Sequence, residues 1–325
     1  MSGKAEKVSI LVPVYNRKNL IEETIKSALN QTYKNVEIII VDNKSTDGTY
    51  EILKKYAEKY ENIKLYRNEE NIGPVRNWMK CIEYATGKYG KILWSDDMIA
   101  PEFLEKTLPF LENNEDVGFV FTGTEIFFSG TNRKVDAYFI GETGIYDINK
   151  YIEGVLFGGN YPVSPGCALF RLKDLKENLI INISNKIKSD FSMHAIGNDL
   201  LIYLLTAKNY TKFAFINEKL AFFRAHDDSI SINTDHGTLT LLYDIAKAYF
   251  VENYREDLIP KLNSILLFHL LKYRKTSKKL GLNGISDFYI KNNNYRPHIE
   301  TSIKIIFKKI KRIIIKSGKR EENYG

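Results

Sequence analysis

The chain has 325 residues and a formal net charge of +7, with 44% hydrophobic and 27% charged residues. These fractions are ordinary for a globular protein and exclude a low-complexity or disordered chain. A chain of this length can bury a large core, and we expect one large domain with a smaller appendage. No run of about 18 uninterrupted apolar residues occurs, so no segment is a candidate for a helix that spans a membrane.

The N-terminal residues and the two cysteines favour a cytoplasmic protein. Residues 1–7 are polar and contain no apolar signal segment. Cys81 and Cys167 lie in apolar surroundings without metal-ligand spacing. We therefore expect two reduced, buried thiols.

Positive charge is concentrated near the C-terminus, where residues 299–325 hold eight basic and three acidic residues. A nucleic-acid partner would need a basic footprint across a domain face, so we expect none. Within 299–316, isoleucines recur at helical spacing opposite a basic arc. A basic amphipathic helix predicts peripheral attachment to the inner face of the cell membrane. The alternative is a helix that docks its apolar face on the rest of the protein.

The first 122 residues alternate between predicted strands and helices. The strands are predicted at 8–14, 36–41, 63–66, 91–93 and 117–122, and the helices near 20–29, 49–57, 75–85 and from Pro101 onward. The run Val8–Val14 is nearly continuous in β-branched residues, which indicates a strand covered on both faces. This alternation predicts an α/β fold with a mostly parallel, doubly wound sheet flanked by helices.

Polar residues follow three of these strands, at Tyr15-Asn16, Asp42-Asn43 and Ser95-Asp96-Asp97. Right-handed crossovers bring such positions to one edge of the sheet, where ligands bind. Two adjacent carboxylates are costly to bury without a cation, so Asp96 and Asp97 predict a metal or phosphate site. Neither GxGxxG nor GxxxxGK[ST] follows the first strand, which argues against a dinucleotide-binding oxidoreductase and a P-loop enzyme.

The pattern is less regular after residue 123. We expect a β-rich excursion over 124–145, a helix over 147–157, a loop over 158–166, a strand over 167–171, and a helix that begins near Asn198. Apolar residues at helical spacing predict further helices over 239–250 and 258–273.

Five blocks in order resemble family 2 glycosyltransferases of the GT-A fold. The blocks are Val8–Arg17, Ser27–Tyr33, Glu37–Asp42 with Ser45–Thr49, Asn71-Ile72-Gly73 with Arg76-Asn77, and Ser95-Asp96-Asp97 with Pro101. The resemblance covers roughly residues 7 to 230 and is densest before residue 105. It implies a catalytic domain over 1–235, divided into a nucleotide-binding half (1–122) and an acceptor half (123–235), followed by a helical region over 236–325.

The resemblance also implies a role for each block of the donor side. Pro13, Val14, Tyr15 and Asn16 would lie along a nucleotide-sugar, and Asp42 would accept a hydrogen bond from the base. Arg76 would lie near the base or the phosphates, and Asp96 near the ribose or a metal-bound water. Ser95, which stands where many relatives carry an acid, is a further candidate for contact with the nucleotide-sugar. Asp97 would bind Mn²⁺ or Mg²⁺, a hard cation that prefers carboxylate oxygens. The block Phe222–Ser231 resembles the family segment in which His226 reaches the metal or the diphosphate.

On the acceptor side, the block from Gly197 resembles the family segment that supplies the general base, with Asn198 in place of an acid. Asp199 would take the proton of the acceptor hydroxyl. The alternative is an Asp that only stabilises the start of a helix. Tyr161, Ser164 and Asn198 are candidate acceptor contacts, although the glycines and prolines around Ser164 could simply shape a loop.

These residues predict a metal-dependent, inverting hexosyltransferase. It would move a sugar from a nucleotide-sugar, of which a UDP-sugar is favoured, to a hydroxyl of a saccharide or lipid-linked glycan. The chain lacks the Gln-x-x-Arg-Trp motif of processive synthases, which favours the addition of one or few sugars. The alternatives are a nucleotidyltransferase on a similar sheet, which should carry a glycine-rich basic loop after the first strand, and a non-catalytic nucleotide-sugar-binding protein.

Overall fold

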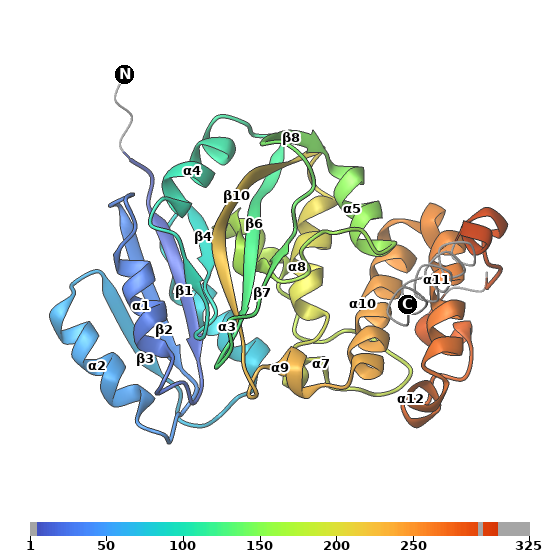
Figure 1. Cartoon of the computed structure of the whole chain (residues 1–325), viewed down its shortest axis with the longest axis horizontal. Coiled ribbons are helices and arrows are strands. Elements are labelled where there is room, and N and C mark those ends of the chain that lie inside the picture. The colour runs from blue at the N-terminus through green and yellow to red at the C-terminus, as the bar shows by residue number, and fades with distance from the viewer. Residues whose placement is uncertain (1–4, 292–294, 305–325) are drawn as a thin grey trace, which may run out of the picture. The chain divides into compact units, whose positions relative to one another are not determined.

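The computed structural model describes residues 5–291 and 295–304, and the chain divides into two units (Figure 1). The first contains Met1–Ile183 and Asp190–Asp235, and the second contains Ser184–Ser189 and His236–Gly325. The expected domain boundary after residue 235 lies at this division, but 184–189 belongs to the second unit. Strand β6 (Val117–Phe128) runs across residues 122 and 123, and the nucleotide-binding and acceptor halves expected on either side stay a prediction.

Four parallel strands form one side of the sheet in the first unit, in the order β3-β2-β1-β4. Their bounds are Val8–Val14 for β1, Val36–Asp42 for β2, Ile63–Arg67 for β3 and Tyr89–Ile92 for β4. Every residue of β1 is buried, as its β-branched run predicted. The parallel, doubly wound prediction is confirmed for this half of the sheet.

Three helices make the crossovers between these strands. They are α1 (Ile21–Leu29), α2 (Thr49–Lys59) and α3 (Pro74–Tyr84). The chain moves from β1 outward through β2 to β3, and α3 then returns it to the other side of β1. The strand order therefore reverses between β1 and β4, and a ligand crevice forms where strand order reverses in such sheets.

The other half of the sheet also contains antiparallel pairs, although its two longest strands run in the same direction as β1. The order continues β9-β6-β10-β5, and only β6 and β10 (Lys212–Ala225) pair in parallel. Strand β9 (Ala168–Arg171) runs antiparallel between β4 and β6. The short β5 (Met98–Ile99), which the sequence pattern did not predict, lies antiparallel to β10.

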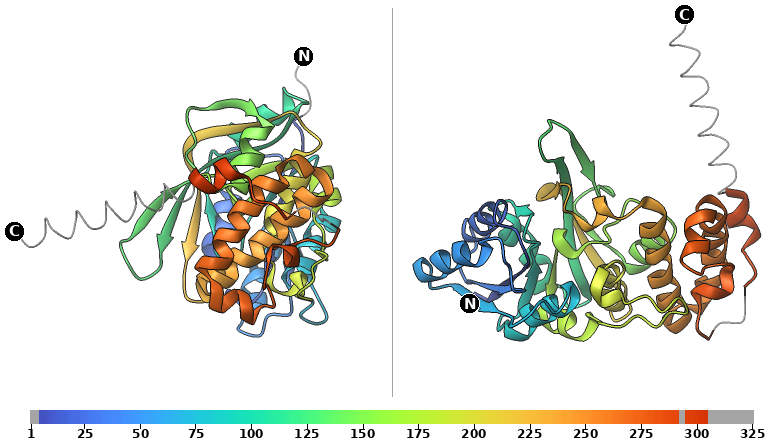
Figure 2. Two further views of the ribbon diagram at one scale, coloured as in Figure 1. Left: turned by 90° about the vertical axis from the view of Figure 1, so that its right-hand side faces the viewer. Right: turned by 90° about the horizontal axis from the view of Figure 1, so that it is seen from below.

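The predicted β-rich excursion contains β7 (Lys134–Ala137) and β8 (Gly144–Asp147). Strand β7 pairs with the end of β6, and this hairpin, green in Figure 2, projects from the first unit. Strand β8 pairs with the beginning of β10.

The remaining helices of the first unit cover this mixed half. They are α4 (Phe103–Glu112), α5 (Ile148–Leu156), η1 (Pro165–Cys167), α6 (Leu172–Asn178), α7 (Phe191–His194), α8 (Asn198–Ala207) and α9 (Ile230–Asn233). Pro101 lies in a turn before α4, so the expectation of proline at its first helical position was wrong. The Asp147 side chain caps α5 by accepting the N–H of Asn149.

Helix α8 is buried along its whole length and packs through aromatic rings. Tyr203 lies 4.9 Å from Phe119 of β6 and 5.2 Å from Tyr151 of α5, measured between ring centroids. An edge-to-face pair such as Tyr203 with Phe119 is a favourable ring arrangement. This packing fixes α8, and with it the residues at its first turn, against the sheet.

The second unit is helical, with α10 (His236–Tyr254), η2 (Glu256–Leu258), α11 (Ile259–Lys272), α12 (Arg274–Lys279) and η3 (Ile285–Phe288). His269 of α11 lies 2.6 Å from the buried carboxylate of Asp244 on α10. None of the helices in the described residues has both the length and the hydropathy needed to cross a membrane. Residues 299–304 are helical, and the rest of the predicted basic helix lies outside the described residues.

Candidate active site

The turn after β1 is tied to the loop after β2. Asn16 has a φ of 50°, in the left-handed region that asparagine tolerates better than most residues. Its N–H donates to Ser45 Oγ at 2.9 Å, and its Oδ1 accepts the N–H of Thr46 at 2.9 Å. Tyr15 beside it is 41% exposed. Pro13 and Val14 are buried in the strand, so Tyr15 is the part of this block that offers a side chain to a ligand.

Asp42, at the end of β2, is fully buried. Its Oδ2 lies 3.0 Å from Nε of Arg67, and it accepts the N–H of Ser45. The Arg67 guanidinium lies over the Tyr50 ring at 4.2 Å, a cation–π arrangement. The carboxylate has no exposed surface in this structure, and its expected hydrogen bond to a base stays a prediction. In this structure Asp42 orients Arg67, which the sequence reasoning did not select.

Asp96 lies between two basic side chains. Its Oδ2 is 2.8 Å from Nε2 of His226 and 3.4 Å from Nε of Arg17. His226 Nδ1 accepts the N–H of Asp228 at 3.2 Å, so in a neutral ring Nε2 carries the proton and donates it to Asp96. Both ring nitrogens have protein partners in this arrangement, and the expected role of His226 at the metal or the diphosphate stays a prediction. Arg17 Nε is buried and pairs with Asp96 at a distance too long for a good hydrogen bond.

Asp97 is 6% exposed and sits against the end of β10. Its Oδ1 accepts the backbone N–H of Arg224 at 2.9 Å, and Arg224 Nε donates to the carbonyl of Asp96 at 3.1 Å. Burial, followed by the neighbouring charge of Asp96, raises the pKa of Asp97 well above its ordinary value. Arg224 also pairs with Glu23 of α1, so it joins three elements around the two acids. Arg224 stands two residues before His226 in the block Phe222–Ser231, and this position could have identified it from the sequence.

A buried lysine, Lys91 of β4, lies beneath this site. Its Nζ donates to the carbonyls of Ile92, at 3.0 Å, and of Gly166. It also lies 4.6 Å from the centroid of the Phe103 ring. Burial lowers the pKa of Lys91 to about 7, opposed by the charges of Cys167 and Asp97. Lys91 thus connects the strand that carries the acids to the turn at 164–167. A lysine inside an otherwise apolar predicted strand was the sequence feature that could have identified it.

That turn is held by several hydrogen bonds. Ser164 Oγ accepts the Trp94 Nε1–H at 2.7 Å and the N–H of Gly166 at 3.3 Å. The Tyr203 hydroxyl donates to the carbonyl of Ser164 at 3.2 Å. Tyr161 packs edge-on against Tyr151, with ring centroids 5.7 Å apart. These contacts are structural, and the predicted acceptor roles of Tyr161 and Ser164 stay predictions.

Asp199 lies in the first turn of α8. Its Oδ1 accepts the N–H groups of Gly197 and Leu200, at 2.9 and 2.8 Å, so the helix-start role considered for it is present. Gly197 has a φ of 107°, which a glycine adopts without strain. Asn198 is completely buried and donates to the carbonyls at 180 and 181, and its expected contact with an acceptor stays a prediction.

The pKa of the Tyr138 phenol is affected by acids from both halves of the first unit. Burial, then the negative charges of Cys167, Asp199 and Asp97, raise its pKa. The hydroxyl therefore lies within electrostatic reach of both carboxylates. Its backbone is held at a φ of 65° by the Asn160 side chain, whose Oδ1 accepts the Tyr138 N–H at 3.1 Å. Such strain in a non-glycine residue persists where surrounding structure enforces it, often at functional sites.

Two further predicted residues lie at the periphery of this cluster. Arg76 of α3 donates to Ser192 Oγ at 2.6 Å, and Ser192 in turn donates to Asp190. Arg76 thus joins α3 to α7, and its predicted place near the base or phosphates stays a prediction. Ser95, between Trp94 and the two acids, is buried.

The acids fit a divalent cation that is completed by a ligand. Within the described ranges, no set of three His, Cys, Asp or Glu side chains forms a metal site by itself. Asp96 and Asp97 nevertheless place two carboxylates side by side, and burial and the charge of Asp96 raise the pKa of Asp97. Mg²⁺ and similar ions often take one or two carboxylates and complete their shell with substrate phosphates and water. The residues present match that pattern.

Comparison with known proteins agrees with this geometry. A family model described as glycosyl transferase family 2 matches residues 9–179. EpsE of Bacillus subtilis is 40% identical over 122 residues, which cover 37% of this chain and 44% of EpsE. An uncharacterized glycosyltransferase of Methanocaldococcus jannaschii is 35% identical over 208 residues, which cover 61% of this chain and 68% of the relative. The matches span about half the length of the first curated relatives.

Two solved structures resemble the fold. The 1–349 fragment of S. aureus TarS in complex with UDP-GlcNAc has a TM-score of 0.64 at 20% identity, over 85% of this chain and 76% of that one. The mannosyltransferase PcManGT from Pyrobaculum calidifontis, in complex with GDP-Man and Mn²⁺, has a TM-score of 0.51 at 14% identity, over 95% of this chain and 81% of that one. The predicted GT-A-type fold is confirmed.

Proposed function

We propose that this chain, which belongs to glycosyl transferase family 2, moves a sugar from a nucleotide-sugar to an acceptor hydroxyl with inversion at the anomeric carbon. The observation that carries the proposal is the pair of acids after β4, with Asp96 held by His226 and Arg17 and Asp97 held by the Arg224 N–H, in a chain that the family model matches. Asp199 begins a buried helix in the acceptor half. A direct displacement needs the base and the leaving diphosphate on opposite sides of the sugar.

The donor side suits a nucleoside diphosphate. The Arg17 guanidinium lies next to Asp96, and Tyr15 offers an exposed ring at the end of β1. A diphosphate would take hydrogen bonds from such a donor, and a base could stack on the ring. We favour a UDP-sugar because the structural relative TarS was solved with UDP-GlcNAc.

Asp97, together with Asp96, would hold Mn²⁺ or Mg²⁺ through carboxylate oxygens, and PcManGT was solved with Mn²⁺. The bound cation would neutralise the charge that builds on the departing diphosphate. Asp199 would accept the proton of the attacking hydroxyl. The Tyr138 phenol stays neutral because its pKa is raised, so it would donate a hydrogen bond within the same site.

The proposed acceptor is a hydroxyl of a saccharide or a lipid-linked glycan, and the proposed product carries one or few added sugars. Residues 158–167 and the start of α8 form the side of the site on which that acceptor would bind. We propose that the protein acts in the cytoplasm.

A donor panel tests the proposal. The full chain is incubated with Mn²⁺ and a set of UDP-, GDP- and dTDP-sugars, with and without oligosaccharide acceptors, and the products are followed by mass spectrometry. We expect a free nucleoside diphosphate from at least one donor, faster when an acceptor is present.

Asp97→Asn serves as the control, since it removes a carboxylate while it can keep the acceptor oxygen that faces the Arg224 N–H. A parallel reaction with nucleoside triphosphates and sugar 1-phosphates that releases pyrophosphate, while no donor releases a nucleoside diphosphate, would show the nucleotidyltransferase alternative. Nucleotide binding without turnover of any donor would show the non-catalytic alternative, and either result would overturn the proposal.

A further inference from the structure

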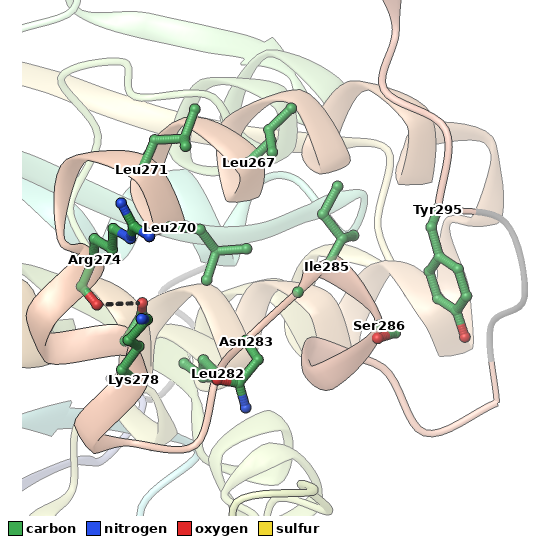
Figure 3. Close-up of a pocket in the computed structure, with 12 residues that line it drawn as sticks. Leu267, Leu270, Leu271, Arg274, Lys278, Leu282, Asn283, Ile285, Ser286 and Tyr295 are labelled. Atoms are coloured by element: carbon green, nitrogen blue, oxygen red, sulfur yellow. Dashed lines mark hydrogen bonds between the residues drawn. The ribbon is translucent and has the colours of Figure 1, made fainter.

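The second unit contains an open groove of about 500 Å³ that is lined by residues of this unit alone (Figure 3). Leu270 of α11 and Ile285 of η3 border the same hollow, with Arg274 at one end and Tyr295 at the other. The volume lies in the range of small-molecule sites, which are concave and mostly apolar. Neither the sugar-transfer residues nor the family match reaches this groove.

The apolar wall of the groove comes from consecutive turns of α11. Leu267, Leu270 and Leu271 are three and four residues apart, so they share one face of the helix. Leu271 is 70% exposed and Leu267 is 39% exposed. Leucines left in water on a shared face are a recognised mark of an interaction surface.

The charged end of the groove is entirely basic. Helix α12 reads Arg-Lys-Thr-Ser-Lys-Lys, and its Arg274 and Lys278 line the hollow. Both residues are exposed, and no acid among the described residues forms an ion pair with either of them. Asp287 of the adjoining η3 accepts the N–H groups of Asn283 and Gly284, at 2.7 and 2.9 Å, and so serves the turn. The groove thus joins an apolar wall to unpaired cations.

Charge complementarity selects the occupant. Residues 305–325 of the same chain carry seven basic and two acidic residues, so Arg274 and Lys278 would repel them. An anion with no alkyl chain would leave Leu267 and Leu271 in water. A molecule with a phosphate and an alkyl chain satisfies both parts of the groove.

We propose that this groove binds an anionic phospholipid of a membrane surface. One acyl chain would lie against Leu267, Leu270 and Leu271, and the phosphate would lie between Arg274 and Lys278. The second unit would then attach the protein to an acidic bilayer through described residues, separately from the basic segment near the C-terminus. This inference does not depend on sugar transfer, because its readout is binding to lipid in the absence of any donor.

Sedimentation of the full chain with vesicles tests the proposal. We expect binding to phosphatidylcholine vesicles that contain phosphatidylglycerol, and at least about tenfold weaker binding to phosphatidylcholine alone. Lys278→Glu should weaken binding to the acidic vesicles by at least about tenfold, since each basic residue near an acidic surface contributes about fivefold and the new acid is repelled. Leu271→Gln should also weaken binding, because it removes the most exposed part of the apolar wall.

Matched substitutions in the first unit separate the groove from general charge and hydropathy. Lys55→Glu makes the same change in net charge at an exposed position of α2. Val135→Gln makes a similar change in polarity at an exposed position of β7. Both should bind within about twofold of the unaltered chain. Inorganic phosphate, compared with chloride at equal ionic strength, should not displace the vesicles.

Three results would overturn the proposal. The first is unchanged binding of either groove variant. The second is an equal loss in its matched control. The third is displacement by inorganic phosphate, which would indicate a site for free phosphate. Circular dichroism of each variant checks that the substitution, at an exposed side chain, leaves the fold intact.

Discussion

Asp199 has a structural contact at the start of α8 and a proposed role as the base. Two substitutions at this residue separate these roles. Its Oδ1 accepts the N–H groups of Gly197 and Leu200, which an asparagine carbonyl could also accept. We expect Asp199→Asn to keep the fold and the affinity for UDP but to lower kcat at least about 100-fold, because an amide cannot act as the base. Steady-state kinetics and calorimetric titration with UDP measure the two effects.

Asp199→Ala is the companion variant, since it removes both the base and the acceptor at the start of α8. It should lower the free energy of unfolding by about 0.5–2 kcal/mol, as the loss of a helix-start acceptor does. Full transfer activity in Asp199→Asn would contradict the assignment of the base.

The burial of Lys91 predicts how the free energy of unfolding depends on pH. Burial lowers its pKa in the folded protein to about 7, below the ordinary value of 10.5. Between these two values the unfolded chain binds a proton that the folded chain does not, so the free energy of unfolding rises with pH in this window. We expect Lys91→Met, which cannot titrate, to show a smaller rise between pH 7 and pH 10. Urea unfolding at several pH values measures this difference.

The control for this experiment is Lys55→Met, which removes an exposed lysine of α2. Its pH dependence should match that of the unaltered chain. If Lys91→Met and the unaltered chain rise equally, the ammonium of Lys91 is not the group that loses its proton on folding.

At the scale of elements, the start of α8 depends on one glycine. Gly197 has a φ of 107°, where a side chain strains the backbone whatever space surrounds it. We expect Gly197→Ala to lower the free energy of unfolding by about 1–2 kcal/mol. It should also reduce kcat, because it disturbs the turn that carries Asp199. Gly144→Ala, at an extended position with only Tyr146 within 4 Å, should change the free energy of unfolding by less than about 0.5 kcal/mol in the same urea experiment.

Stability and kinetics together decide this prediction. Unchanged stability and kcat in Gly197→Ala would show that the turn tolerates a side chain and that its geometry does not position Asp199.

The element scale also shows where the catalytic acids receive their surroundings. Asp96 and Asp97 follow β4, but their partners come from the turn after β1 and from the end of β10. Strand β5, only two residues long, pairs with β10 directly after the two acids and brings Arg224 to them. The antiparallel part of the sheet therefore completes a site that the parallel part begins.

At the scale of the whole molecule, the two units should respond differently to the donor nucleotide. Every residue proposed to bind UDP or the cation belongs to the first unit. We expect UDP with Mn²⁺ to slow amide hydrogen exchange in segments 13–17, 94–97 and 222–226, because a bound ligand opposes the local opening that exchange requires. Exchange in segment 236–291 should be unchanged. Hydrogen exchange followed by mass spectrometry measures each segment.

Removal of the cation with EDTA is the matched condition, and it should reduce the protection around residues 94–97 most. Protection of 236–291 equal to that of 94–97 would contradict the assignment of the nucleotide site to the first unit.

The sequence by itself determined the parallel half of the sheet, the crevice at the ends of β1, β2 and β4, and the family. These features depend on local patterns, since β-branched runs define buried strands and polar residues directly follow them. It also located Asp96, Asp97 and Asp199 at element ends, where short motifs are specific.

Only the tertiary structure decided the partners of these residues. Asp42 is buried against Arg67, His226 donates to Asp96, and Asn198 is buried against the backbone at 180 and 181. Each of these contacts joins positions that lie 17 to 130 residues apart in the sequence. Strands β9 and β5 also pair with strands that are distant in the sequence, so local patterns did not predict their direction. The spacing of hydrophobic residues and the residue types in turns indicate local structure along the chain. Burial and hydrogen bonding at a site depend instead on which distant segments the fold brings together.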